Sequence, residues 1–200
     1  ATRALNAAAH SGGVRIAREA VTVGGRTWAA GTAFIDRDDA VAAGRALVPG
    51  VALEPVASMP VTGLALKAPR LGLYKPWAAS MDEGWTRFLL EQYGFAPVSL
   101  DNATIQKGGL RAKFDCIVLP DVSKELMEKG KPKVEEGAMS YFVDLPPGYS
   151  GGLDSSGARA IRTFVEQGGT LIALSGACEY VTSQFNIPVV NALAHARPEE

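Results

Sequence analysis

The stretch RLGLYKPWAASMDEGWTRFLLEQYGF, residues 70–95, contains one strand pattern followed by one helix pattern, and it decides the fold class. Leu71–Tyr74 is a short apolar run typical of a buried strand. Ser80 and Glu83 have the spacing of a capping box, in which each side chain bonds the backbone N–H of the other residue. Apolar residues then recur at helical spacing, at Met81, Trp85, Phe88, Leu89 and Tyr93. Gly94 supplies the stop, so the stretch predicts a strand and then an amphipathic helix.

The same alternation continues along the chain. Further short strands are expected at Ala96–Leu100, Phe114–Leu119, Thr170–Leu174 and Ile187–Val190. Helices are expected between these strands. One begins at Asp154, Ser155 or Ser156, which can cap it, and its inner face consists of Ile161, Phe164 and Val165. Another follows the strand at Thr170–Leu174 and continues through Phe185. Short strands separated by helices predict an α/β fold with a mostly parallel sheet covered on both faces. Ligands of such sheets collect at the carboxyl ends of the strands, here residues 75–83, 120–123 and 175–179.

Residues 1–66 have a different composition, with six Arg and no Lys, whereas all eight Lys lie from Lys67 onward. The pattern predicts a helix, two extended runs and a short helix, at Thr2–Ala9, Val14–Val21, Arg26–Ile35 and Ala40–Leu47. Gly24–Gly25 between the extended runs is a hairpin signal. The prolines that follow predict an irregular connection. We therefore expect a small α+β segment at 1–66, followed by an α/β domain at 67–200.

The overall composition excludes several classes of protein. The chain has 200 residues, 47% of them hydrophobic and 20% charged, as in a soluble globular protein. Twenty basic against 21 acidic residues give a net charge of −1 and no general electrostatic reason to bind nucleic acid or an acidic membrane. The longest apolar runs are too short to span a bilayer, and no signal peptide opens the chain.

The cysteines and histidines do not have the spacing of a metal site. There are two of each, with no C-x-x-C and no H-E-x-x-H motif. Ordinary zinc sites need such spacings, so we expect neither metal nor cofactor in this chain. Cys116 and Cys178 lie in or beside apolar runs and are expected to be inert, buried thiols, with a disulfide bond between them as the alternative.

Ser175 stands in the most suggestive turn of the sequence, LSGAC at residues 174–178. A strand that runs directly into a helix can hold a nucleophile at a strained elbow, with helix N–H groups ready to stabilise an oxyanion. The G-x-S-x-G motif is not matched, however, because Ala173 stands two residues before the serine. The histidine nearest in sequence is His195. Ser175 is therefore expected to cap the following helix, and a serine hydrolase is the alternative.

Asp82 and Glu83 form an acidic pair after the first strand, with Trp77 close by in sequence. Such a pair facing Ser175 across the sheet edge would bind a cation or raise the pKa of one carboxyl group. The capping box gives Glu83 a structural explanation, so a structural role is the main expectation and a pocket lining is the alternative.

Three motifs in order carry a family resemblance: the stretch at 70–95, FDCIVLPD at 114–121 and GGTLIAL at 168–174. Over about residues 67–190 the chain resembles the C-terminal part of bacterial zinc carboxypeptidase-like proteins, the carboxypeptidase A-type metallopeptidases. The piece Gly24–Ile35 looks like the segment that joins the peptidase domain to this part. In that family the C-terminal part resembles a class I glutamine amidotransferase-like domain, which implies a flavodoxin-like three-layer sandwich.

The resemblance also implies a parent polypeptide with an upstream zinc peptidase domain, exported to the periplasm or the cell exterior. This chain departs from true amidotransferases, because Ser175 stands where their cysteine is expected and His195 lacks the following glutamate. Asp82 or Glu83 falls near where some relatives place a pocket glutamate.

The leading prediction is thus a non-catalytic accessory domain that serves substrate positioning, docking or oligomerisation, with the upstream domain or a second copy as partner. One alternative is a small hydrolase or amidase that uses Ser175 with Asp82, Glu83 or His195. Another is a peptide- or sugar-binding module edged by Trp77, Asp82, Glu83 and Ser175.

Overall fold

The computed structural model describes residues 2–10, 12–47, 49–60, 62–131 and 146–192. The chain divides into two compact units, the first formed by residues 1–69 with 89–96 and the second by residues 70–88 with 97–200. The division after Pro69 falls just beyond the change in composition at residue 67. Among the described residues, no helix is both long and apolar enough to cross a membrane.

The second unit is built on a four-stranded sheet in the order β7-β6-β8-β9, and every neighbouring pair is parallel. The strands are β6 (Leu71–Tyr74), β7 (Val98–Leu100), β8 (Cys116–Leu119) and β9 (Thr170–Ala173). All four coincide with predicted strands. The α/β class with a parallel sheet is therefore confirmed, and the strand that comes first in this unit lies inside the sheet.

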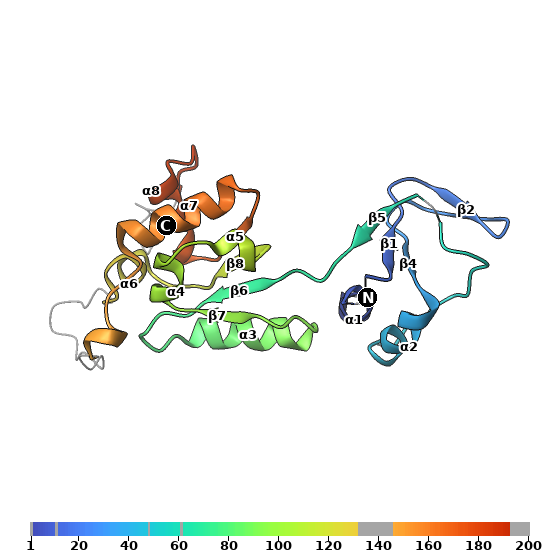
Figure 1. Cartoon of the computed structure of the whole chain (residues 1–200), viewed down its shortest axis with the longest axis horizontal. Helices are drawn as coiled ribbons and strands as arrows, with labels where there is room; N and C mark the ends of the chain where they lie inside the picture. The colour runs from blue at the N-terminus through green and yellow to red at the C-terminus, as the bar shows by residue number, and fades with distance from the viewer. Residues whose placement is uncertain (1, 11, 48, 61, 132–145, 193–200) are drawn as a thin grey trace. The chain divides into compact units, whose positions relative to one another are not determined.

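Helices lie on both sides of this sheet, and Figure 1 shows α3 on the opposite side from α5 and α7. They are α3 (Met81–Gln92), α4 (Asn102–Gln106), α5 (Leu110–Lys113), α6 (Lys124–Lys129), α7 (Asp154–Glu166) and α8 (Gly176–Phe185), with a 3-10 turn at Pro147–Tyr149. The short helices α4 and α5 were not predicted. Asp101 begins α4 by accepting a hydrogen bond from the Thr104 N–H at 2.7 Å.

The main core lies between the sheet and the helices α4 to α8. Side chains alternate along a strand, so Tyr74 faces this core while Leu71 and Leu73 face the α3 side. Ile161 and Phe164 of α7 are fully buried in it, as predicted. Val165, predicted to belong to the same face, is instead 40% exposed. Along a helix Val165 follows Phe164 by 100°, which places it at the edge of the buried stripe.

Helix α3 does not turn its apolar side chains toward the sheet of the second unit. Glu83, on the opposite face, is the buried residue of this helix. The five apolar positions that the sequence placed on one stripe are all exposed. The helix and its stripe were predicted correctly, but the stripe does not pack on the sheet.

The predicted strand at Ile187–Val190 is wrong. No strand is assigned there, and Ile187, Val189 and Val190 are exposed. Pro188 has no N–H to give to a sheet, and the Val189 N–H instead bonds the Ile187 carbonyl in a tight turn at 2.7 Å. Strand β9 is therefore an edge of the described sheet.

The first unit contains a three-stranded antiparallel sheet, a hairpin and two helices. The sheet has the order β4-β1-β5, with β1 (Val14–Ile16), β4 (Ala33–Ile35) and β5 (Leu64–Leu66), and the helices are α1 (Thr2–Ala9) and α2 (Arg37–Arg45). The predicted hairpin forms between β2 (Val21–Val23) and β3 (Arg26–Trp28), with positive φ at Gly24 and Gly25. Strand β5 lies where an irregular connection was predicted, because its pairing with the distant β1 leaves no local signal. The α+β character of this segment was predicted correctly.

Candidate functional site

Ser175 lies at a sharp turn between β9 and α8. Its backbone has φ 47° and ψ −116°, a conformation that residues other than glycine rarely adopt. The side chain is exposed and makes no capping hydrogen bond to α8. Ser175 therefore stands at the N-cap position of α8, as predicted, but its side chain does not form the expected capping bond. In the described part of the chain its hydroxyl has no hydrogen-bond partner.

The first N–H groups of α8 already have acceptors. The Gly176 N–H donates to Asp121 Oδ1 at 2.9 Å. The next two donate to the carbonyls of Leu174 and Ser175, at 3.0 and 2.9 Å. Asp121 comes just after β8, the strand next to β9. Its carboxylate therefore accepts the hydrogen bond of the Gly176 N–H, the group that directly follows Ser175. A negative charge is favourable there because the helix dipole is positive at this end.

The acidic pair Asp82 and Glu83 is divided between two environments. Glu83 is 6% exposed, and its Oε1 accepts hydrogen bonds from Arg87 Nε at 3.0 Å and Nη2 at 2.6 Å. Asp82 is exposed. One half of the capping box forms, since Ser80 Oγ accepts the Glu83 N–H at 3.1 Å. The Glu83 carboxylate binds Arg87 rather than returning to the backbone, so it is committed to an ion pair.

The structure does not bring this acidic pair to Ser175. Helix α3 begins after β6 and Ser175 follows β9, with β8 between these two strands. Neighbouring strands lie about 4.8 Å apart, so the two strand ends are separated by about 10 Å. Trp77 packs edge-on against Tyr149, with ring centroids 5.1 Å apart. His195 lies outside the described residues.

The cysteines differ from their prediction in one case. Cys178 is exposed rather than buried, and its Sγ lies 3.3 Å from the Ala173 carbonyl oxygen. Cys116 is half-buried, and burial, with the nearby Asp115 carboxylate, raises the pKa of its thiol. Cys178 lies in the first turn of α8 between two different environments, because Ala177 faces the core and is buried whereas Cys178 lies on the exposed side.

A polar network that the sequence did not indicate occupies the carboxyl end of β6. The Tyr74 hydroxyl donates to Asn102 Oδ1 at 2.8 Å, and Asn102 Nδ2 donates to the Gly151 carbonyl at 2.6 Å. Gln106 Nε2 donates to the Gly152 carbonyl at 3.1 Å. These bonds hold the loop before α7 against the edge where ligands of parallel sheets bind. Polar residues directly after a strand, here Asp101 and Asn102, are the signal that sequence reading could have used.

Tyr180 of α8 lies in the same core as Tyr74. Its hydroxyl is buried and has no hydrogen-bond partner among the described residues. Burial, together with the carboxylates of Glu128 and Asp154, raises the pKa of Tyr180 to about 12. It therefore stays neutral at physiological pH, as a buried phenol without a basic partner does.

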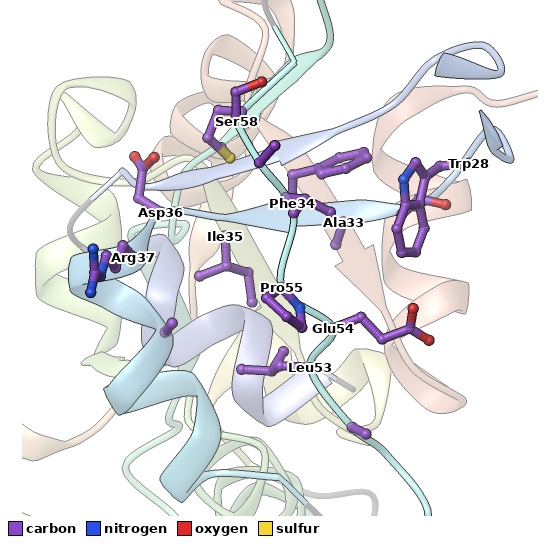
Figure 2. A pocket seen from close by; sticks show the side chains of 16 residues that line it. Trp28, Ala33, Phe34, Ile35, Asp36, Arg37, Leu53, Glu54, Pro55 and Ser58 are labelled. Atoms are coloured by element: carbon purple, nitrogen blue, oxygen red, sulfur yellow. The ribbon is translucent and has the colours of Figure 1, made fainter. Parts of the chain in front are cut away.

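The first unit contains a cavity of about 850 Å³, shown in Figure 2. It lies between β4, the start of α2 and residues 52–59, and none of the predicted site residues lines it. Trp28 packs edge-on against Phe34 with ring centroids 5.9 Å apart, and the Arg26 guanidinium stacks over the Trp28 ring at 4.2 Å. Arg26 also pairs with Glu54. The volume is in the range of ligand cavities, and the Trp28 Nε1–H is buried without a hydrogen-bond partner among the described residues.

In the part of the chain that the structure describes, no three His, Cys, Asp or Glu side chains come together as a metal site. Comparison of the chain with protein-family models, curated proteins and solved structures found no match. The family resemblance carried by the three motifs therefore stays a prediction.

Proposed function

We propose that this chain is a non-catalytic accessory domain of a secreted zinc carboxypeptidase-like protein, where it serves positioning, docking or assembly. The observation that supports this most directly is the hydrogen bond from the Gly176 N–H to Asp121. In an elbow enzyme the N–H after the nucleophile stabilises the oxyanion. Here that donor is bound to a carboxylate of the protein itself.

The chemistry at the elbow follows from this contact. A developing oxyanion beside Ser175 would lie close to the Asp121 carboxylate instead of a free N–H, and like charges repel each other. Removing one oxyanion donor costs about 10²–10³ in turnover even where the other groups are intact. Ser175 also lacks a hydrogen-bonded base among the described residues, so its hydroxyl is not activated.

The arrangement of the sheet supports the proposed type of domain. The strands of the second unit, numbered in chain order, lie as 2-1-3-4, which is the order of the flavodoxin-like doubly wound fold. We take this unit to be a flavodoxin-like, amidotransferase-like three-layer sandwich, with Ser175 at the place of the missing nucleophile. The zinc then belongs to the upstream peptidase domain, and the protein acts in the periplasm or outside the cell.

A small hydrolase that uses Ser175 is the second candidate, and one observation favours it. The strained backbone at φ 47° holds an exposed hydroxyl that caps nothing, as a nucleophile elbow requires. A peptide- or sugar-binding role at Trp77, Asp82, Glu83 and Ser175 has less support, because Glu83 is committed to Arg87.

A fluorophosphonate probe, which labels activated serines, separates the two candidates. On the folded chain we expect labelling of the wild type to equal that of Ser175→Ala. The Asp121→Ala variant frees the Gly176 N–H without adding a base, so it is expected to stay unlabelled as well. Labelling of the wild type that Ser175→Ala abolishes would overturn the accessory-domain proposal and establish the hydrolase.

A further inference from the structure

Strand β4 forms one edge of the antiparallel sheet in the first unit, beside the cavity of Figure 2. In the order β4-β1-β5 it has β1 as its one partner among the described strands. Residues 33–37, which are β4 and the start of α2, line one wall of the cavity, and residues 52–59 line another. All of these residues belong to the first unit, so the cavity is a feature of one compact body.

The hydrogen bonds to β1 show which backbone groups of β4 are left unpaired. The Asp36 N–H donates to the Gly13 carbonyl at 2.7 Å, and bonded positions alternate along an antiparallel strand, so Phe34 bonds β1 as well. Ala33 and Ile35 therefore direct their N–H and C=O groups away from β1, and both residues line the cavity. In the described part of the chain these four groups have no hydrogen-bond partner.

Unpaired backbone groups at the edge of a sheet are a template for another extended chain. Residues 52–59 are not that chain, because no strand is assigned to them and no backbone hydrogen bond joins them to β4. Figure 2 shows them crossing the strand near Pro55 rather than running beside it. Since they also line the cavity, they keep the whole sheet of another molecule from this edge, whereas a single extended segment fits between the two walls.

We propose that this cavity binds an extended peptide segment, which pairs with Ala33 and Ile35 as a fourth, antiparallel strand of the sheet. The antiparallel direction continues the existing pairing and gives the more stable ladder per residue. Three residues of extended chain span about 10 Å, enough to pair with the three residues of β4. The cavity volume of about 850 Å³ is in the range that encloses a ligand of this size. Main-chain hydrogen bonds supply the affinity in this mode of recognition.

The side chains around Phe34 determine which peptide fits. Residues directly opposite each other in a ladder share a face of the sheet. The peptide residue opposite Phe34 thus lies on the face where Trp28, Val56 and Met59 pack, and this position favours an apolar, β-branched side chain. Its two neighbours in the peptide lie opposite the unpaired residues of β4 and supply the N–H and C=O groups that bond them.

A nuclear magnetic resonance titration of the isotope-labelled full chain tests the proposal. The probe is an acetylated and amidated pentapeptide, Val-Thr-Val-Thr-Val. We expect a Kd below about 1 mM, with the largest changes of amide chemical shift at Ala33 and Ile35 and slower hydrogen exchange of these two amides in the complex. No change at these two amides with about 1 mM peptide, or larger changes in the second unit, would overturn the proposal.

Backbone methylation of the peptide tests the pairing itself. With the central valine opposite Phe34, the N–H groups of both threonines face β4, whereas the N–H of the central valine faces away. Methylation of both threonine nitrogens is therefore expected to weaken binding at least about 10-fold, and methylation of the central valine nitrogen to have little effect. The reverse result would overturn the antiparallel pairing, and equal binding of the two methylated peptides would overturn strand addition.

Proline on either edge of the sheet gives a matched pair of protein variants. Ala33→Pro removes an N–H that faces the cavity without breaking a bond to β1, and it is expected to weaken peptide binding at least about 10-fold. The control is Ala65→Pro in β5. The Ala65 N–H also points away from β1, because Arg15, which lies opposite it, bonds β4, so this variant should bind the peptide as the wild type does.

Equal binding by the wild type and both proline variants would overturn the proposal. The amide spectra report whether each variant keeps the fold, and the methylated peptides test the pairing on the wild-type chain independently of any substitution. The inference goes beyond the accessory role proposed above and does not rest on it. Neither measurement involves Ser175, so a failure of this inference is distinct from a failure of the proposed function.

Discussion

Two buried tyrosines show how a single hydroxyl group can stabilise this protein or cost it stability. Tyr74 and Tyr180 are each at most 1% exposed and lie in the same core. The Tyr74 hydroxyl bonds Asn102, whereas that of Tyr180 has no partner in the described part of the chain. A buried polar group without a hydrogen bond costs about 1–3 kcal/mol. The two residues therefore form a natural pair for comparison.

We expect Tyr74→Phe to lower the free energy of unfolding by about 1–2 kcal/mol, because it leaves the Asn102 oxygen unpaired in the core. Tyr180→Phe is expected to leave stability unchanged or to raise it, because it removes a hydroxyl that bonds nothing. Urea unfolding followed by circular dichroism measures both. A loss of more than about 1 kcal/mol in Tyr180→Phe would show that its hydroxyl has a partner.

At the scale of the element, α3 is held in place by its polar face. Arg87 bonds Glu83 on the same helix and also donates to the Pro97 carbonyl at 3.0 Å and to Ser99 Oγ at 2.9 Å. Pro97 and Ser99 lie beside and within β7. The ion pair with Glu83 thus holds the Arg87 guanidinium in the position from which it bonds the edge strand β7. Because α3 is attached to the sheet through this polar face, its apolar face points away from the sheet.

Glu83→Ala is expected to lower the free energy of unfolding by about 2 kcal/mol, because it leaves Arg87 partly buried without its carboxylate. The matched control is Asp82→Ala, one residue away on the exposed side, which should change stability by less than about 0.5 kcal/mol. Thermal unfolding of the two variants makes the comparison. Equal effects would contradict the structural role assigned to the pair.

At the scale of the whole molecule, Asp115 joins the starts of β6 and β8 to α5. Its carboxylate accepts hydrogen bonds from Arg70 Nη2 and Arg111 Nη1, both at 2.8 Å, and from the Arg70 backbone N–H at 3.0 Å. These contacts, Arg70 first, hold the pKa of Asp115 well below its ordinary value of 3.8. The pair is largely exposed, so solvent screens much of the interaction.

This depressed pKa predicts a specific dependence of stability on pH. In the unfolded chain Asp115 takes up a proton near pH 3.8, whereas in the folded protein it stays ionised to lower pH. Its stabilising contribution is therefore full above that pH and is lost as the pH falls below it. We expect Asp115→Asn to be less stable than the wild type at pH 7, with the gap closing below about pH 4. A gap that widens in acid would contradict this sign.

Sequence patterns with a local cause predicted the structure well. The hairpin at Gly24–Gly25 depends on two adjacent residues with positive φ, and the cap of α3 depends on Ser80, three residues from the N–H that it accepts. The strand β5 was missed because its reason for forming is a pairing with β1, far away in the chain. The prediction of a strand at Ile187–Val190 was wrong because an apolar run does not indicate whether a partner strand is present.

The sequence by itself thus determined the alternation of strands and helices around the parallel sheet, the hairpin, and the helix α3 with its apolar stripe, because each of these depends on residues within a few positions of one another. Only the tertiary structure decided that this stripe faces outward, since periodicity marks a face of a helix without saying which face meets the sheet. It also decided the chemistry of the elbow. Asp121 reaches the Gly176 N–H across 55 residues of sequence, and a contact of that range is set by the order of the strands, which no local pattern encodes.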